Sequence, residues 1–244
     1  MDEKLLRPDV LTDFEPGLEL FWDEPTRPTG MTFSRHNRED KLPTFQFHNS
    51  EQNRAVCLHR FGGHELLAVE IMAYALLAFP NAPRGFRKGV ANTLKEEQEH
   101  VRLYMEHMTL LGVEFGDLPL FKHFWKQVPF LKTPLQYLSV MALTFEMANL
   151  DFAPLYRDSF RRHGDEVSAQ LMEQIIKDEI SHVSFGMHWF NKLKPEDEKS
   201  DFELYAASLP PILRPKRAKG FVFQEENRQK ARVPQEWINS LKEL

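Results

Sequence analysis

The fold is decided by residues 50–79, SEQNRAVCLHRFGGHELLAVEIMAYALLAF, a stretch that contains no proline. Its apolar residues recur at three- and four-residue spacings over a length that no β-strand reaches, and this periodicity predicts a long helix. Ser50 is a typical N-cap residue. Pro80 and Pro83 are expected to end the helix, because proline fixes φ and lacks a backbone donor.

Three further stretches show the same periodicity. They cover about residues 85–111, 133–163 and 165–193. Gly112 and Gly164 follow the first two stretches, as left-handed C-cap glycines commonly do, and a proline stops the last one. The sequence therefore predicts four long helices.

The connections between these helices predict the topology. The first and second helices are separated by only a few residues, as are the third and fourth, so each pair is expected to form an antiparallel hairpin. The link between the pairs is much longer and runs from Val113 to Lys132. Two tight hairpins joined by a long crossover form the ferritin-like variant of the four-helix bundle. We therefore predict an all-α, ferritin-like fold.

Prolines divide the chain into three predicted parts. An irregular N-terminal arm covers residues 1–49, the bundle covers residues 50–194, and a C-terminal extension covers residues 195–244. The extension is expected to contain a shorter helix, about Asp197 to Ser208, and a basic tail.

Composition indicates a soluble globular chain, since 42% of the residues are hydrophobic, 27% are charged and the net charge is -5. The longest apolar stretch, Leu66 to Phe79, contains Glu70 and is too short to span ~30 Å of hydrocarbon. The start of the chain has no secretory signal pattern. We therefore predict a cytoplasmic location without membrane contact.

A single cysteine, Cys57, excludes an intramolecular disulfide and the Cys-rich zinc patterns, so any metal would be held by His and carboxylates. Two Glu-x-x-His motifs supply such groups, Glu97 with His100 and Glu179 with His182. Residues three apart lie on one face of a helix, so both side chains can reach a common metal. One such motif is expected by chance, but two occur, each on the second helix of a hairpin.

Partner carboxylates are expected on the first and third helices at the same height. Glu146 precedes Glu179 by 33 residues and Glu65 precedes Glu97 by 32, whereas Glu70 precedes Glu97 by 27. Residues equidistant from a hairpin turn lie side by side, so the nearly equal separations favour Glu65, with Glu70 kept as the alternative. Glu70 then corresponds to Asp151, because each follows its proposed ligand by five residues on a different helix face.

Burying these carboxylates among apolar residues costs several kcal/mol unless they are paired or bound to metal. Oxygen and nitrogen ligands without thiolate suit two iron or manganese ions, or one of each, better than zinc alone or calcium. The predicted ligands are Glu65, Glu97, His100, Glu146, Glu179 and His182.

Six nearby side chains are candidates to support the metal or to replace a ligand: His64, Glu70, Glu96, Tyr104, Asp151 and Asp178. Most also have a structural interpretation. Glu96 and Asp178 can orient the imidazoles or be solvated helix charges. His64, like His59, can be a further ligand or a hydrogen-bonded helix histidine, and Tyr104 can be redox-active or a core residue.

Small residues and proline also have two interpretations. Gly62 and Gly186 can leave an opening above the metals or let helices approach closely. Pro154 frees the carbonyl of Leu150 and is expected to kink the third helix. The crossover aromatic residues are expected to pack it onto the bundle or, alternatively, to form a substrate wall; they are Phe115, Phe121, Phe124, Trp125 and Phe130.

This constellation resembles the ferritin-like di-iron carboxylate proteins. A narrower resemblance is to an uncharacterised domain-of-unknown-function family in that superfamily, itself similar to the tRNA hydroxylase MiaE. It is carried, over about residues 50–193, by His59, His64-Glu65 with Ala68 and Val69, Glu96-Glu97-x-x-His100, Phe145-Glu146 with Leu150-Asp151-x-x-Pro154, and Asp178-Glu179-x-x-His182-Val183.

The resemblance implies that the six predicted ligands hold two iron ions, with Glu97 and Glu179 as bridges, and that O₂ is a co-substrate. It implies an oxidase or hydroxylase acting on an organic substrate, either a small molecule or a modified RNA. The alternatives are a ferroxidase, an iron-handling protein, a peroxide-detoxifying protein and a metal-stapled helical module without catalysis. We expect a monomer or a homodimer.

The basic tail contains seven cations: Arg214, Lys216, Arg217, Lys219, Arg228, Lys230 and Arg232. Interleaved aromatic residues such as Phe221 and Phe223 would suit RNA binding. The sequence favours instead an intramolecular contact with the acidic N-terminal arm. The acids that cluster there are Asp9, Asp13, Glu15, Glu19, Asp23 and Glu24.

Overall fold

The computed structural model describes residues 17–34, 41–196 and 200–244. Regular structure in these ranges is helical, apart from one isolated parallel bridge between Phe33 and Leu120. The chain forms two compact units, Met1–Lys126 and Gln127–Leu244, whose boundary falls inside the predicted crossover. The predicted all-α fold class is confirmed, and the paired long helices are consistent with a helical bundle.

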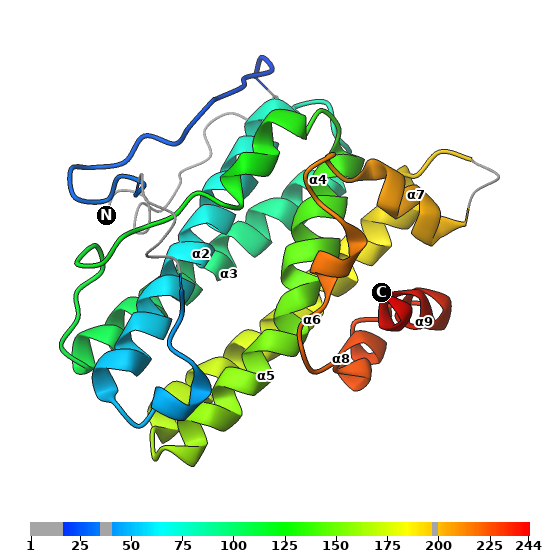
Figure 1. The fold of residues 1–244 in the computed structure, drawn as a ribbon. Helices are drawn as coiled ribbons and strands as arrows, with labels where there is room; N and C mark the ends of the chain where they lie inside the picture. The colour runs from blue at the N-terminus through cyan, green and yellow to red at the C-terminus, as the bar shows by residue number, and fades with distance from the viewer. Residues whose placement is uncertain (1–16, 35–40, 197–199) are drawn as a thin grey trace. The chain divides into compact units, whose positions relative to one another are not determined.

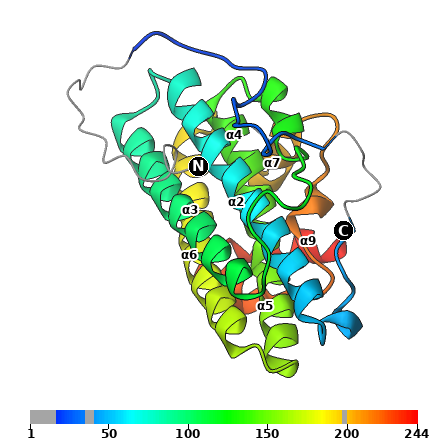
Figure 2. The same cartoon turned by 90° about the vertical axis from the view of Figure 1, so that its left-hand side faces the viewer.

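The first unit is built on an antiparallel pair of long helices, α2 (Glu51–Ala78) and α3 (Arg84–Leu110), which lie side by side in Figures 1 and 2. Ser50 caps α2, because its side chain accepts a hydrogen bond from the backbone N–H of Asn53. Beyond α3, Gly112 adopts a φ of 76°, the left-handed conformation predicted for the cap. The first predicted hairpin is therefore confirmed.

Helix α2 is buried over most of its length. By length and hydropathy it would also pass as a membrane span, but 72% of its most apolar window is buried inside the structure. A core helix of a soluble protein has the same properties, so this is weak evidence for a span.

Within the first unit, described residues of the N-terminal arm contact α2 and the crossover. The backbone N–H of Leu20 donates to the carbonyl of Leu77 at the end of α2, and that of Ser34 donates to Leu120 of the crossover. Trp125 is buried and its indole N–H donates to the carbonyl of Asp23. These contacts support the packing interpretation for Trp125, whereas Phe130 is 37% exposed. A short 3-10 helix, η2 (Phe45–Phe47), precedes α2, and η3 (Trp125–Phe130) ends the crossover.

The second unit contains the other hairpin. Its first arm is one continuous helical segment made of α4 (Pro134–Val140), the π-helix η4 (Met141–Glu146) and α5 (Met147–Arg162). Its second arm is α6 (Glu166–Leu193), antiparallel to α5 in Figure 1. The second predicted hairpin is confirmed, although the π-helix was not predicted.

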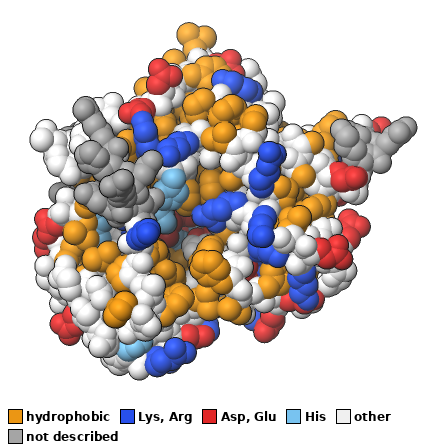
Figure 3. Space-filling view, in the orientation of Figure 1, with side chains coloured by type: hydrophobic (Ala, Val, Ile, Leu, Met, Phe, Trp, Pro, Cys, Tyr) orange, Lys and Arg blue, Asp and Glu red, His pale blue; other side chains and the backbone are white. Residues whose placement is uncertain are grey.

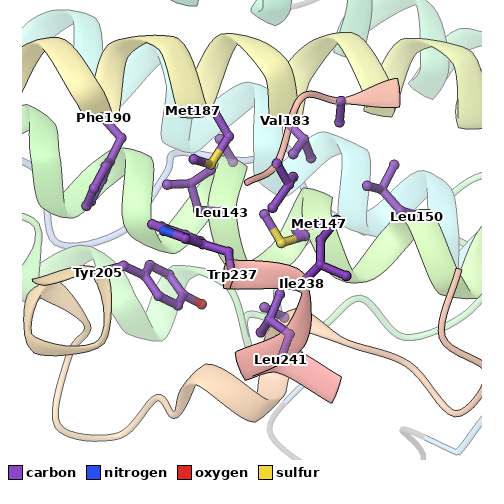
Figure 4. Packing of buried hydrophobic residues seen from close by; sticks show 14 of the residues in the cluster. Leu143, Met147, Leu150, Val183, Met187, Phe190, Tyr205, Trp237, Ile238 and Leu241 are labelled. Carbon is purple, nitrogen blue, oxygen red and sulfur yellow. The ribbon is translucent and has the colours of Figure 1, made fainter. Parts of the chain in front are cut away.

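The C-terminal extension folds against this second hairpin. It contains α7 (Asp201–Ser208), the 3-10 helix η5 (Pro215–Ala218), α8 (Glu225–Lys230) and α9 (Gln235–Glu243). Trp237, Ile238 and Leu241 of α9 are fully buried in one cluster with residues of η4, α5 and α6, as Figure 4 shows. The extension is thus part of a hydrophobic core. The predicted start of its first helix falls at residues 197–199, outside the described residues.

Candidate metal centre

Three of the predicted ligands come together in the first unit. Glu65 of α2 lies with Glu97 and His100 of α3, and one ligand atom from each lies within 4.8 Å of those of the other two. All three side chains are buried, with 6%, 1% and 1% of their surface exposed. The Nδ1 atom of His100 is 3.2 Å from the Oε2 atom of Glu97.

The local sequence explains this convergence. Glu97 and His100 are three residues apart on the buried face of α3, together with Val90, Thr93 and Tyr104. The antiparallel pairing with α2 brings Glu65 beside them, as the equal distances from the turn predicted. Two buried carboxylates and an imidazole form a set of O and N donors that fits a divalent transition metal.

The second unit contains the matching motif on α6. Glu179 and His182 are 2% and 1% exposed, and the His182 Nδ1 atom lies 3.9 Å from Glu179 Oε2. Asn149 of α5 donates from Nδ2 to Glu179 Oε1 at 2.8 Å, which fixes the orientation of that carboxylate. Glu146, 6% exposed, is the last residue of the π-helix.

The π-helix next to Glu146 is held by a hydroxyl pair. Thr144 donates from Oγ1 to the carbonyl of Ser139 at 2.7 Å and lies 2.8 Å from the hydroxyl of Tyr205. Burial raises the pKa of Tyr205, and the Thr144 hydrogen bond partly offsets this. π-Helical turns leave the regular hydrogen-bond ladder and are frequent at functional sites. Here the turn sets the register of the segment that ends in Glu146.

Glu70 and Asp151, the two alternative acids, each form an ion pair with an arginine. Arg27 of the N-terminal arm donates to both carboxylate oxygens of Glu70, at 3.0 and 2.6 Å. Arg228 of the C-terminal extension donates to both oxygens of Asp151, at 2.5 and 2.8 Å. The structure therefore groups Glu65, and not Glu70, with Glu97 and His100.

Asp151 also holds the backbone of the extension. It accepts the N–H groups of Gly220 at 2.8 Å and Gln224 at 2.7 Å. Asn227 donates to the carbonyl of Leu150 at 3.1 Å, the acceptor that Pro154 was predicted to free. The extension is therefore anchored on α5, within the second unit. Three of the acids predicted to contact the tail, Asp9, Asp13 and Glu15, lie outside the described residues. Of the others, Glu24 pairs with Lys122 of the crossover.

The remaining candidates differ in burial and contacts. Tyr104 is buried, and its ring packs against Phe61 at 5.9 Å. Glu96 is exposed, and Asp178 accepts a hydrogen bond from Gln174 at 2.8 Å. The ring of His64 contacts that of His123 in the crossover at 4.6 Å.

His59 lies on α2 and binds the crossover through its imidazole. Its Nε2 atom accepts the backbone N–H of Gly116 at 3.0 Å, and its ring packs against Phe115 at 5.2 Å. Burial lowers the pKa of His59 to about 4, with partial compensation by the charge of Asp117. The neutral ring is therefore the form that holds the crossover.

Both glycines of the predicted opening lie where neighbours approach closely. A Cβ atom on Gly62 would lie 3.2 Å from Phe115 and from Tyr104. A Cβ atom on Gly186 would lie 2.4 Å from the Cβ of Ala142. These distances favour the packing interpretation over an opening above the ligands.

Sequence reasoning missed Asn149 and the two anchoring arginines. Asn149 follows Glu146 by three residues, so its place on the same helix face was a usable signal. Arg27 and Arg228 are 43 and 77 residues from their acids, and no periodic pattern marks them.

Comparison with known proteins gives similarity without an activity. The family described as "Protein of unknown function (DUF455)" matches residues 9–239. An uncharacterized protein of Haemophilus influenzae is 25% identical over 152 residues, which are 59% of this chain and 53% of that protein. The chain thus spans about half the length of this curated relative. No solved structure matches the chain.

Proposed function

We propose that this chain, which belongs to the family described as "Protein of unknown function (DUF455)", is a dinuclear iron or manganese oxidase or hydroxylase that uses O₂ on an organic substrate. The observation that carries this proposal is the buried group of Glu65, Glu97 and His100, with ligand atoms within 4.8 Å of one another. A divalent cation bound between these desolvated carboxylates would compensate their negative charge.

The second set of ligands in this proposal is Glu146, Glu179 and His182. The repeat of the Glu-x-x-His motif on α6, the burial of all three side chains and the nearly equal separations along both hairpins support it. Four carboxylates and two imidazoles would then hold two ions, and hard oxygen donors with imidazole and no thiolate favour iron or manganese.

The metals, when bound, would supply the electrons that reduce O₂. The chain's own residues would position the ions and keep water away from them. Asn149 would hold Glu179 in one orientation through its 2.8 Å hydrogen bond. The side chains of Leu66, Val69 and Val101, all at most 5% exposed, would make the surroundings of Glu65 and Glu97 apolar.

Metal content tests the ligand assignment. Purified protein loaded anaerobically with Fe(II) or Mn(II) and desalted should retain about two ions per chain. Glu97→Ala and Glu179→Ala should each retain fewer ions, because each removes one buried ligand. The matched control is Glu99→Ala, an exposed carboxylate on the same helix that pairs with Arg102. Equal metal content in Glu97→Ala and wild type would refute the proposed centre.

Oxygen chemistry is tested separately from metal binding. Exposure of the Fe(II)-loaded protein to O₂ should change its absorption spectrum, and Glu146→Ala should abolish that change. Growth of a ferric mineral without consumption of an organic reductant or substrate would favour the iron-handling alternative instead.

A further inference from the structure

Arg217 of η5 is a largely buried arginine whose charge is incompletely compensated. Its Nη1 atom is buried and has no hydrogen-bond partner among the described residues. Burial lowers the pKa of its guanidinium. Buried charges in proteins are ordinarily paired, because the desolvation of an unpaired ion is costly.

Two aromatic rings provide the contacts of this guanidinium. Its carbon Cζ lies 5.3 Å from the ring centre of Phe145 and 5.9 Å from that of Phe152. Both distances are near the outer limit of about 6 Å for a cation–π interaction, so the compensation is weak.

Arg228, in the same extension, combines an aromatic contact with an acid partner, although its Nε atom is also buried without a hydrogen-bond partner among the described residues. Its guanidinium lies 3.9 Å from the ring centre of Phe223 and also donates to both oxygens of Asp151. Arg217 has aromatic contacts but forms no ion pair with an acid among the described residues. The component that differs between the two sites is therefore an anion.

An exposed apolar surface lies next to Arg217. The ring of Phe221 is 86% exposed and meets Phe152 edge-on, with ring centres 5.6 Å apart. Val222 beside it is 49% exposed. The chain from residue 204 to residue 224 contains four cations and no acid, and Figure 3 shows Lys and Arg side chains among hydrophobic ones over the segment that contains η5.

We infer that Arg217 binds the oxyanion, a phosphate or a carboxylate, of the organic substrate, and that Phe221 with Phe152 binds a flat apolar part of the same molecule. This inference rests on the proposed function, because Phe145 directly precedes the proposed ligand Glu146. An anion held at Arg217 would tie the substrate to the helix that contributes this ligand.

The test measures binding of four probes to the metal-free, full-length protein by calorimetry and thermal shift: inorganic phosphate, phenyl phosphate, acetate and benzoate. The preferred oxyanion identifies the head group. The aromatic member of that pair should bind roughly 10-fold tighter than the simple anion, because the ring contacts Phe221.

Two variants separate the contributions. Arg217→Met keeps the length and apolar contacts of the stem but removes the charge, and should weaken binding of both members of the preferred pair by roughly 10-fold or more. Phe221→Ala should remove only the preference for the aromatic member. Arg214→Met is the control, since Arg214 is exposed, and should bind nearly as wild type.

A further readout distinguishes binding from packing. Without ligand, Arg217→Met should unfold at the same temperature as wild type or a higher one, because it removes a desolvated charge. Equal affinity of wild type and Arg217→Met for every probe would overturn the inference, and Arg217→Gln serves if the methionine variant does not fold. Tight binding of a short single-stranded RNA would also overturn the inference if Arg214→Met and Arg217→Met weakened that binding equally. Metal retention by Arg217→Met tests the metal centre independently, so either proposal can fail alone.

Discussion

Replacing Arg228 should destabilise the protein more than replacing any exposed cation. Arg228 and Asp151 both have 0% of their side-chain surface exposed and are joined by two hydrogen bonds. Arg228 also donates to the carbonyl of Ala218 at 3.0 Å, so the pair ties η5 and α8 to α5. Arg228→Met would leave the Asp151 carboxylate buried with only the N–H groups of Gly220 and Gln224.

The expected loss follows from the burial of this pair. Removing one partner of a fully buried ion pair costs about 3–5 kcal/mol, since the remaining charge stays desolvated. For a chain of this length, 1 kcal/mol corresponds to roughly 2–4 °C in Tm, so Arg228→Met should lower Tm by about 6–20 °C. Differential scanning calorimetry and urea titration followed by tryptophan fluorescence measure both quantities.

Arg102→Met provides the matched control. Arg102 pairs with Glu99 on α3, but the two side chains are 43% and 51% exposed, and exposed pairs contribute about 0–1 kcal/mol. The double variant Arg228→Met with Asp151→Leu should recover part of the loss, because no charge then remains buried. A Tm change in Arg228→Met no larger than in Arg102→Met would refute the reasoning.

Two further predictions concern single side chains. Because the pKa of His59 is lowered to about 4 in the folded protein, its contribution to stability is complete above pH about 6.5 and is lost as the pH falls toward 4. His59→Gln should therefore reduce the loss of urea stability between pH 6.5 and 4, by on the order of 1–3 kcal/mol; parallel pH profiles of both proteins would contradict this. Gly186→Ala should cost about 1–3 kcal/mol through overpacking, since its Cβ would lie 2.4 Å from that of Ala142. Pairing it with Ala142→Gly should restore stability, and a neutral effect of Gly186→Ala alone would exclude the close approach.

The helices and half of the candidate site could be predicted because their signals are local. Apolar periodicity and the boundary residues placed both hairpins, since burial of one helix face repeats every three or four residues. Equidistance from the first turn selected Glu65 for the group with Glu97 and His100. Glu70, only five residues away, could be set aside for the same geometric reason.

The rest depended on contacts between distant residues. The π-helix is held by Thr144 with Tyr205, 61 residues apart, and nothing in the local sequence distinguishes that turn from an α-helical one. The overall charge of the tail predicts a basic surface, but its cations differ in environment: Arg228 is fully buried, whereas Lys230 is exposed. Composition reports the charge of a segment and not which of its members is desolvated.

Each proposed ligand, Glu65 or Glu146, is followed five residues later by a second acid, Glu70 or Asp151. This offset explains why the second acid pairs with an arginine instead of joining the proposed ligands. Five residues at 3.6 per turn rotate a side chain by about 140°, so the second acid of each pair points away from the first. In each unit this second acid is buried and binds an arginine of an extension: Arg27 for Glu70 and Arg228 for Asp151. Each arginine also stacks on an aromatic ring of its own extension, Phe33 at 4.1 Å and Phe223 at 3.9 Å. Both the arm and the tail are therefore attached by an arginine–carboxylate ion pair to helices that contribute proposed ligands. Because Arg27 and Glu70 retain 3% and 4% exposure, Arg27→Met should cost less stability than Arg228→Met, and the reverse order in calorimetry would contradict this equivalence.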